Sequence, residues 1–449
     1  MKKILIVGAG PAGLGAAHYF SQNPYFDVTV IDKGKNIEDR IKSSNSSLLF
    51  GLGGAGGFSD GKLNIHQSVG GNLANWNLTK NQALNLLNYL VEHIYAKNSP
   101  EPLHKIILNE SENEQLEKKA KESGLRYKPI QQIHIGSDNL PKLIANFRNE
   151  LISKGVKFKF ETDVSNLIID NNHCKGIKYA QGEEYGDEVI LSAGRAGQNW
   201  IQKICKDYNI NISFGDLELG LRIEIPNKIY EEIEKISYDP KIIIPISDQV
   251  KVRTFCTNPS GFVVLEDYSD FVGVNGHSFK HRKSNNTNFA LVTALNKSQN
   301  VNSAEYATKL LKNISDNTGK KAILQSYINI KNNAPGIGNS ITVPTLREHI
   351  YENISDYYPA ETLSALITGL EKLNLLIPDL CGSNTLVYAP EVKFRQIKVQ
   401  LNENLESSVK NLYFAGDCTG LVCDIIHSTA TGWLIAEKIT SKYKTSELV

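Results

Sequence analysis

A short segment at the N-terminus constrains the fold more than any other part of the chain. Four apolar residues, Ile4 to Val7, precede the glycine-rich sequence Gly8-Ala9-Gly10-Pro11-Ala12-Gly13, and apolar residues at helical spacing follow. A second apolar run ends on Asp32, 19 residues after Gly13. This order predicts a buried strand, a tight turn, a helix and a second parallel strand, the β-α-β unit that binds dinucleotides.

Each residue of the turn has a distinct expected role. Gly8 makes the tight turn, Gly10 lets the backbone approach a pyrophosphate, and Gly13 permits close packing of helix on strand. Pro11 and Ala12 begin the helix, whose free backbone N–H groups face the phosphates. A purely structural glycine turn is the alternative interpretation.

The acid at the end of the second strand completes the predicted nucleotide site. Asp32 is expected to accept hydrogen bonds from the adenosine ribose, and the adjacent Lys33 is assigned to the same site. FAD and NAD share this motif, so the choice between them depends on the rest of the chain.

A second glycine-rich segment runs from Phe50 to Leu63. Six glycines in fourteen residues exclude the interior of a helix or strand and favour close contact between backbone and ligand. A flexible linker is the alternative, but the segment holds large and charged side chains. The residues assigned to cofactor binding here are Gly53, Gly54, Ala55, Gly56 and Gly57.

Two later segments end predicted strands on small residues. The run 187–194 closes on Ala193 and Gly194, and the run 411–420 contains Gly416-Asp417 after an apolar strand. In a flavoprotein this aspartate would bond a ribityl hydroxyl.

A helix is expected directly after the last of these strands. It runs from about Asp424 to Thr440, and Asp424 and Ile425 at its N-terminus are assigned to the cofactor. The positive end of that helix would favour an anionic reduced flavin ring. The pairing of this segment with the N-terminal motif predicts FAD rather than NAD.

The segment Gly53-Gly-Ala-Gly-Gly-Phe-Ser-Asp-Gly-Lys-Leu63 resembles a hallmark of a family of largely uncharacterised bacterial FAD-dependent dehydrogenases, which is similar to the glutathione-reductase-type flavoproteins. Further similar stretches are Gly220–Pro226, Thr254-Phe255-Cys256 and the segment 412–432. The resemblance spans nearly the whole chain and implies FAD as cofactor and a dehydrogenase activity.

The fold class expected is α/β, with a Rossmann-like FAD-binding domain that is interrupted by a mixed α+β substrate domain. The FAD-binding domain is assigned to 1–80, 130–215 and 386–449. Residues 81–129 are interpreted as a helical insertion or cap, and residues 216–385 as the substrate domain.

Several side chains are candidates for the chemistry beside a flavin. His427, Asp60 and Lys62 are assigned catalytic roles, His427 as a general base. The alternative for His427 is a packed helix histidine, and a helix cap is favoured for Asp424. Cys418 and Cys423 have the spacing of a redox pair, but they lie far along the chain from the usual position of such a pair.

Arg222, Glu224 and His277 are assigned to the substrate, with a surface ion pair as the alternative for the first two.

Composition excludes several classes of partner. The net charge of +1 argues against nucleic acid, and no apolar run reaches the ~18 residues of a membrane span. Six scattered cysteines indicate a reducing, cytoplasmic location and neither disulfides nor a metal site.

The sequence therefore predicts an FAD-dependent dehydrogenase, oxidase or reductase that transfers a hydride between a small molecule and flavin N5. The alternatives are an FAD-dependent monooxygenase that uses NAD(P)H and oxygen, an RNA-modifying or non-redox flavoprotein, and a nicotinamide-only dehydrogenase. The electron partner is left open, and a homodimer is compatible with this organisation.

Overall fold

The computed structural model describes residues 1–42, 48–106, 108–214, 217–268, 270–295, 303–394 and 397–446. The chain divides into two compact units. Unit 1 comprises residues 1–104, 133–215 and 396–449, and unit 2 comprises residues 105–132 and 216–395. The domain boundary expected at 215–216 lies outside the described residues.

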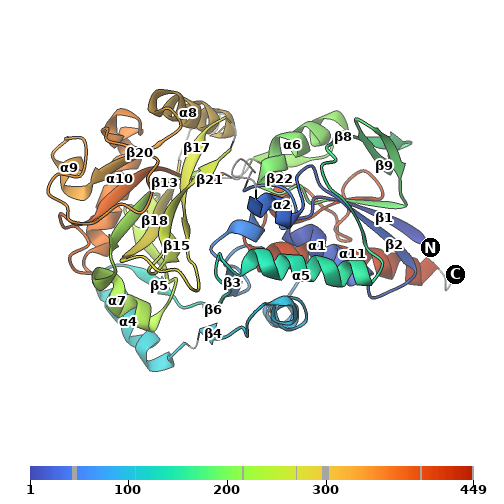
Figure 1. Ribbon diagram of the computed structural model, residues 1–449, viewed down its shortest axis with the longest axis horizontal. Coiled ribbons are helices and arrows are strands. Elements are labelled where there is room, and N and C mark those ends of the chain that lie inside the picture. The colour runs from blue at the N-terminus through green and yellow to red at the C-terminus, as the bar shows by residue number, and fades with distance from the viewer. Residues whose placement is uncertain are drawn as a thin grey trace. The chain divides into compact units, whose positions relative to one another are not determined.

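A five-stranded parallel sheet forms the centre of unit 1, in the order β23-β11-β1-β2-β7. Its strands β1 and β2 are labelled in Figure 1. Each neighbouring pair is parallel. The predicted Rossmann-like sheet is therefore confirmed. Its strands are β1 (Lys2–Val7), β2 (Phe26–Ile31), β7 (Lys157–Lys159), β11 (Glu188–Leu191) and β23 (Leu412–Phe414).

Strand β1 is apolar and buried from Ile4 to Val7 because both faces of the sheet are covered there. Ile4 and Ile6 point into one buried cluster together with residues of helix α1 (Pro11–Phe20) and helix α11 (Ile425–Ser446). Leu5 and Val7 point into a second cluster on the opposite face. Alternate residues of one strand thus serve two cores, as a period of two requires.

The remaining elements of unit 1 connect and cover this sheet. They are α2 (Ile37–Lys42), η1 (Gly56–Phe58), β3 (Lys62–Ile65), η2 (Leu73–Trp76), α3 (Lys80–Leu90), the π-helix η3 (Val91–Ala96), α5 (Leu140–Ser153), β8 (Val164–Asp170), β9 (His173–Tyr179), β10 (Gly182–Tyr185), η4 (Arg195–Gly197), α6 (Gln198–Asp207), β12 (Ile212–Phe214), β22 (Ile397–Val399) and η6 (Gly416–Thr419). Strand β6 (Gln131–His134) runs across the boundary between the units.

Unit 2 is built on an eight-stranded mixed sheet in the order β20-β19-β21-β13-β18-β15-β14-β5. Its central pairs are antiparallel, and β19 with β20 is parallel. The sheet strands are β5 (Arg126–Lys128), β13 (Leu217–Pro226), β14 (Lys241–Pro245), β15 (Lys251–Asn258), β18 (Asn286–Ala294), β19 (Ala322–Ser326), β20 (His349–Ile350) and β21 (Leu386–Phe394). The other elements are β4 (Lys105–Ile106), α4 (Glu110–Glu122), α7 (Asn227–Ile236), the hairpin β16 (Phe262–Asp267) and β17 (Val272–His277), α8 (Ser303–Thr318), α9 (Tyr327–Lys331), η5 (Ile354–Asp356) and α10 (Ala360–Leu373).

The units differ from the expected domain boundaries in three places, and residues 130–132, expected in the FAD-binding domain, belong to unit 2. The expected insertion at 81–129 is divided, with 81–104 in unit 1 and 105–129 in unit 2. Strand β21 was expected in the FAD-binding domain but belongs to unit 2, because it pairs with β13 and β19 there. Sequence periodicity identifies a strand and does not identify the sheet that it joins.

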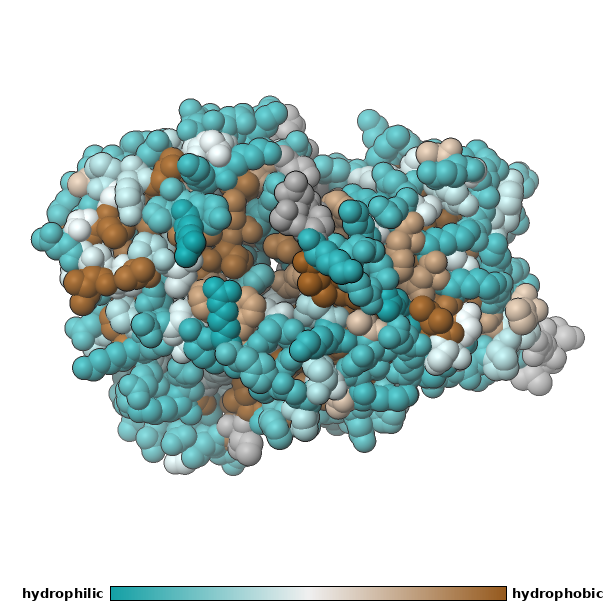
Figure 2. Space-filling view, in the orientation of Figure 1, coloured by the Kyte–Doolittle hydropathy of each residue, from teal (hydrophilic) through white to brown (hydrophobic). Residues whose placement is uncertain are grey.

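Hydrophilic residues cover most of the face shown in Figure 2, and hydrophobic residues form small groups among them. Large hydrophobic residues that are exposed include Ile341 and Val343. Within the described residues, no helix has both the length and the apolar character needed to span a bilayer.

Candidate functional site in unit 1

The turn after β1 has the close contacts that glycine alone allows. Gly8 has a φ of +112°, and a Cβ there would lie 2.2 Å from the carbonyl oxygen of Ser192. A Cβ on Gly13 would lie 2.0 Å from the carbonyl oxygen of Gly8. Both glycines are therefore required by contacts within the protein itself.

Gly10 differs from these two glycines. Its backbone is extended, with a φ of −78°, and the nearest atom to an added Cβ is the Cα of Gly54 at 3.9 Å. A side chain at position 10 would thus meet no clash within the protein. Gly194 is similar in one respect, since no atom lies within 4 Å of a Cβ added there. At these two positions the space that glycine leaves open is available to a ligand.

Asp32 organises the backbone around this turn. Its Oδ2 accepts a hydrogen bond from Ala9 N, and its Oδ1 accepts from Gly34 N and Gly51 N, each at 2.8 Å. Two carboxylate oxygens provide about four acceptor positions, so one position remains for a ligand hydroxyl. The carboxylate therefore joins the first glycine turn to the second glycine-rich segment.

The second glycine-rich segment lies against the first. Gly53 N donates to the Ala9 carbonyl at 2.8 Å, and a Cβ on Gly54 would lie 3.1 Å from the Cα of Gly10. Gly51, Gly53 and Gly54 all have positive φ. Two segments about 40 residues apart thus form one backbone surface, as their glycine content led us to expect.

Arg40 holds the second segment in place, and sequence reasoning missed it. The side chain is 3% exposed, and its guanidinium donates to the carbonyls of Leu52, Gly54 and Leu48 at 2.5, 3.1 and 3.0 Å. Burial lowers the pKa of Arg40 to about 10, and Asp32 opposes that change. Arg40 therefore remains charged at neutral pH. A single arginine in a polar helix gives no sequence signal for this role.

Replacing Arg40 by lysine is expected to lower the free energy of unfolding by about 2 kcal/mol, because lysine keeps the charge but lacks the fork that reaches three carbonyls. Urea unfolding measures the change. The partly exposed Arg148, which pairs with Glu38, provides the control. Its replacement by lysine should change stability by less than about 1 kcal/mol. Equal effects of the two substitutions would contradict the role given to Arg40.

The third and fourth predicted segments reach the same place. Ser192 Oγ donates to the carbonyls of Val7 and Gly8, at 3.1 and 2.9 Å. A Cβ on Gly416 would lie 2.7 Å from the Cβ of Ala12. The structure therefore brings all four predicted segments together at the carboxyl end of the parallel sheet, where ligands bind in open α/β folds.

Asp417 is paired with an arginine that the sequence analysis did not identify. Arg195 Nε lies 3.2 Å from Asp417 Oδ2, and both side chains are partly exposed. Arg195 directly follows Gly194, so a single turn supplies open backbone and a positive charge.

Cys418, which follows Asp417, is fully buried, and burial raises the pKa of its thiol to about 12. Both Cys418 and Cys423 are free thiols.

His427 occupies a different environment from the one expected for a general base. It is 0% exposed, and its Nδ1 and Nε2 lie 2.8 Å from Asp424 Oδ1 and from the carbonyl oxygen of His66. Burial disfavours the charged ring, but Asp424 and the His66 carbonyl raise the pKa of His427 above its usual value. Both ring nitrogens therefore face acceptors of the protein itself, and neither faces an open position for a substrate. This geometry argues against the predicted catalytic role.

Asp424 caps helix α11 and fixes the imidazole ring of His427. Its Oδ1 accepts from His427 N at 2.8 Å, and its Oδ2 accepts from Asn64 Nδ2 at 3.0 Å. The pair Asp424–His427 thus joins the start of α11 to strand β3 and the loop after it.

The Asp424–His427 pair should make the stability of the wild-type protein depend on pH in a defined direction. Because the folded-state pKa of His427 is raised, its contribution is fully present below the unfolded pKa of about 6.5 and is lost as pH rises through the folded pKa. The difference in free energy of unfolding between wild type and His427→Gln should therefore be largest at acidic pH and shrink on going to alkaline pH. Urea unfolding over that range tests this. The exposed His104, replaced in the same way, provides the control for the change of residue type, and a difference for His427→Gln that grows with pH would refute the assignment.

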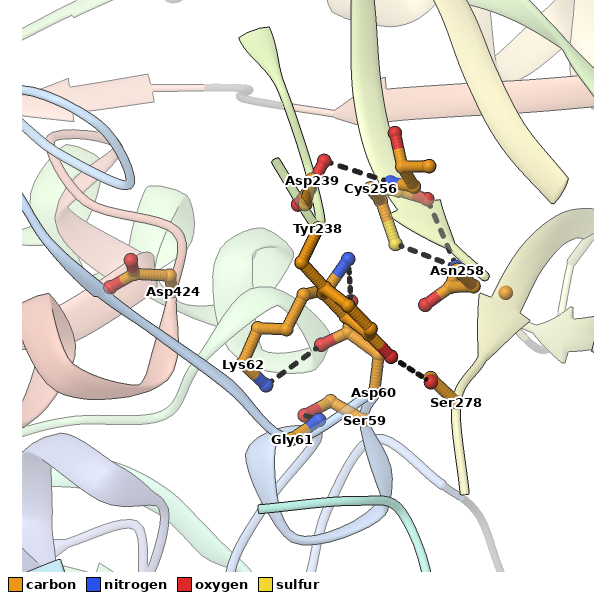
Figure 3. Close-up of polar contacts among 12 residues, drawn as sticks. Ser59, Asp60, Gly61, Lys62, Tyr238, Asp239, Cys256, Asn258, Ser278 and Asp424 are labelled. Atoms are coloured by element: carbon orange, nitrogen blue, oxygen red, sulfur yellow. Dashed lines mark hydrogen bonds and ion pairs between the residues drawn. The ribbon is translucent and has the colours of Figure 1, made fainter. Parts of the chain in front are cut away.

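The remaining candidates of unit 1 form an ion pair at the start of β3. Lys62 Nζ lies 2.9 Å from Asp60 Oδ2, and the two side chains point toward each other in Figure 3. The lysine is 4% exposed and the aspartate is more accessible. Their predicted catalytic roles remain predictions.

The substrate residues assigned in unit 2 are mostly inaccessible. Arg222 and Glu224 are both 0% exposed. Arg222 Nε pairs with Glu391 Oε2 at 2.8 Å, and Glu224 accepts from Asn286 Nδ2 at 3.1 Å and from Tyr388 OH at 2.5 Å. Neither side chain is free to contact a substrate carboxylate or amine, and the alternative of a surface ion pair is also wrong because the residues are buried. His277 is half-buried at the end of β17.

Comparison with known proteins adds to this geometry. Residues 216–394 match the family described as FAD-dependent protein, C-terminal domain-like, and residues 6–45 match the NAD(P)-binding Rossmann-like domain. An uncharacterized protein of Clostridium beijerinckii is 21% identical over 98% of this chain and 81% of its own length. The chain thus carries the domains of an FAD-dependent oxidoreductase. The predicted enzyme class and cofactor are confirmed at this level.

Solved structures with a similar fold include two amino-acid oxidoreductases. Glycine oxidase from Geobacillus kaustophilus is 12% identical, with a TM-score of 0.44 over 98% of this chain and 95% of that chain. L-proline dehydrogenase from P. horikoshii is 11% identical, with a TM-score of 0.41 over 98% of this chain and 94% of that chain.

Proposed function

We propose that this protein oxidises or reduces a small molecule by hydride transfer with FAD, that unit 1 holds the FAD, and that unit 2 contributes the substrate site. The observation that supports this most strongly is the convergence of four glycine-containing segments at the carboxyl end of the parallel sheet. The proposal includes membership of the glutathione-reductase-type flavoproteins and a cytoplasmic location.

The residues of unit 1 fit a dinucleotide in three respects. The open space at Gly10 lies at the N-terminus of α1, where backbone N–H groups would bind a pyrophosphate. Asp32 retains an acceptor position for a ribose hydroxyl, and Lys33 follows it. Asp417 and Arg195 lie beside Gly194 and Gly416 and would contact the ribityl and phosphate portions.

The protein's own part in the chemistry is to position the cofactor and the substrate and to exclude water. A bound flavin supplies the acceptor or donor of the hydride. The Gly53–Gly57 segment and Gly194 would support the cofactor with backbone, and the start of α11 would present its positive end to it. Asp424 and His427 act here as positioning residues, since they fix that helix start. We assign no single general base. The candidates are the accessible titratable groups, of which Asp60 is one.

An anaerobic titration of the purified protein tests the direction of electron flow. Reduction of its flavin by candidate amines, amino acids or hydroxy acids, without NADH or NADPH, is the expected result for a dehydrogenase or oxidase. Oxygen consumption that requires NADPH and substrate together would favour the monooxygenase alternative instead. If neither type of reductant reduced the flavin, the proposed hydride transfer would be wrong.

A further inference from the structure

One face of the unit 2 sheet brings three cations to a single aromatic ring, the half-buried Phe255 of β15. The ring centroid lies 3.9 Å from Lys393 Nζ and 5.0 Å from Arg253 Cζ. Lys241 Nζ lies 5.4 Å from the same point. No two of these cations can be farther apart than twice the longest of these distances, so they lie within about one Debye length, ~10 Å at 0.1 M salt, and repel one another. The cluster therefore favours a negative charge beside it.

Small residues on the intervening strands make this arrangement possible. Strands β18 and β13 lie between β15, which carries Phe255, and β21, which carries Lys393. The β18 residue opposite Phe255 is Ala290, and Gly220 of β13 lies opposite Val292, two residues further along β18. Side chains two residues apart on a strand share a face. The methyl group of Ala290 and the bare Cα of Gly220 thus leave room for Lys393 to extend across the sheet to the ring.

Two of the three cations are each paired with a carboxylate. Lys241 Nζ lies 2.6 Å from Asp239 Oδ2, and Asp239 is 2% exposed. Arg253 Nε donates to Glu218 Oε1 at 2.8 Å, and Arg253 Nη2 donates to Glu218 Oε2. Each pair is neutral as a whole, so the third cation decides the net charge of the cluster.

Lys393 has no carboxylate of its own. The nearest carboxylate oxygen, Glu391 Oε1, lies 3.3 Å from Lys393 Nζ, but Glu391 already pairs at 2.8 Å with the fully buried Arg222. Glu391 Oε1 has no hydrogen-bond partner among the described residues, so its contact with Lys393 lacks hydrogen-bond geometry. The Lys393 side chain is 16% exposed, and its ammonium carries three N–H donors. These contacts leave an excess of one positive charge in the described part of the cluster.

We propose that Lys393 binds the carboxylate of a small monoanionic substrate. This inference rests on the proposed function, because it names the class of substrate that unit 2 would bind. A carboxylate carries one negative charge, which equals the excess, and its oxygens accept charge-assisted hydrogen bonds from the ammonium. A phosphate monoester carries about 1.5 to 2 negative charges at neutral pH and would exceed it. The Phe255 ring supports the ammonium by a cation–π contact and keeps it in place.

Calorimetric titration of the purified protein with sodium butyrate tests this proposal. Butyramide, which has nearly the same shape and no charge, is the matched probe. At low ionic strength butyrate should bind at least about tenfold more tightly than butyramide, because hydrogen bonds between charged groups are the stronger ones. Equal affinities for the two probes in the wild-type protein would overturn the proposal, and this comparison needs no variant.

Two lysine variants locate the bound carboxylate. Lys393→Met keeps the length of the side chain and removes its charge, so it should weaken butyrate binding by at least about tenfold. Lys235→Met, at an exposed lysine of α7, should leave butyrate affinity unchanged. Equal butyrate affinity in Lys393→Met and the wild type would refute the assignment. If Lys393→Met fails to fold by circular dichroism, the comparison of butyrate with butyramide decides.

The titration requires no flavin, so it separates this inference from the proposed function. A colourless protein that bound butyrate through Lys393 would contradict the proposed function alone. A flavin-containing protein that did not prefer butyrate to butyramide would contradict the role of Lys393 alone.

Discussion

Replacing Gly10 by valine will abolish FAD retention and leave the fold intact. An added Cβ at this position has no protein atom closer than 3.9 Å, so the FAD-free protein should lose only the about 1 kcal/mol that an apolar N-cap costs α1. The side chain would instead fill the space where the backbone approaches the pyrophosphate. We expect FAD affinity to fall by about 100-fold or more, which corresponds to about 2.7 kcal/mol. Flavin content after gel filtration and titration of the FAD-free protein with FAD measure the effect.

The matched control for this substitution lies in unit 2. A Cβ on Gly273 has its nearest neighbour, the Pro390 carbonyl oxygen, at 3.4 Å, so Gly273→Ala adds a methyl group to unit 2 and leaves the glycine segments of unit 1 unchanged. Gly273→Ala should retain FAD, whereas Gly10→Ala should weaken it and Gly10→Val should remove it. Full FAD occupancy in Gly10→Val would refute our placement of the pyrophosphate.

Replacing Gly432 by alanine will destabilise unit 1 severely. Gly432 lies in α11, where a Cβ would be 1.8 Å from the carbonyl oxygen of Ala12 in α1. Figure 1 shows the two helices next to each other. The neighbour is backbone and cannot rotate away, so the helices must separate. We expect a loss of more than about 4 kcal/mol, in spite of the helix propensity that alanine gains. Urea unfolding followed by circular dichroism measures the loss.

An exposed position on the same helix provides the comparison. Ser441→Ala changes a surface residue of α11 and should alter stability by less than about 0.5 kcal/mol. If Gly432→Ala were as stable as Ser441→Ala, the close contact between α1 and α11 would not exist in the protein.

The sequence predicts those features that depend on residues near one another in the chain. The β1-α1-β2 unit follows from Gly8, Gly10, Gly13 and Asp32, because turn geometry and strand burial are local properties. The parallel sheet follows from continuous apolar runs such as Val28–Ile31. Helix α11, expected from about Asp424 to Thr440, begins at Ile425 as that expectation requires.

Roles that depend on distant partners were not predictable. Nothing near Arg40 in the sequence indicates that its guanidinium reaches three carbonyls of another loop. Arg222 has the residue type of a substrate ligand, but it forms a buried ion pair with Glu391, which is 169 residues away in the sequence. His427 has the residue type of a base, and only the fold places acceptors at both nitrogens. Residue type indicates what a side chain can do, and tertiary contacts decide what it does.

The absorption spectrum of the purified protein, with mass analysis of any cofactor released on denaturation, shows whether the chain binds FAD. We expect an oxidised flavin spectrum and the mass of FAD, both retained in Gly273→Ala and lost in Gly10→Val. A colourless protein that also failed to take up added FAD would contradict this expectation.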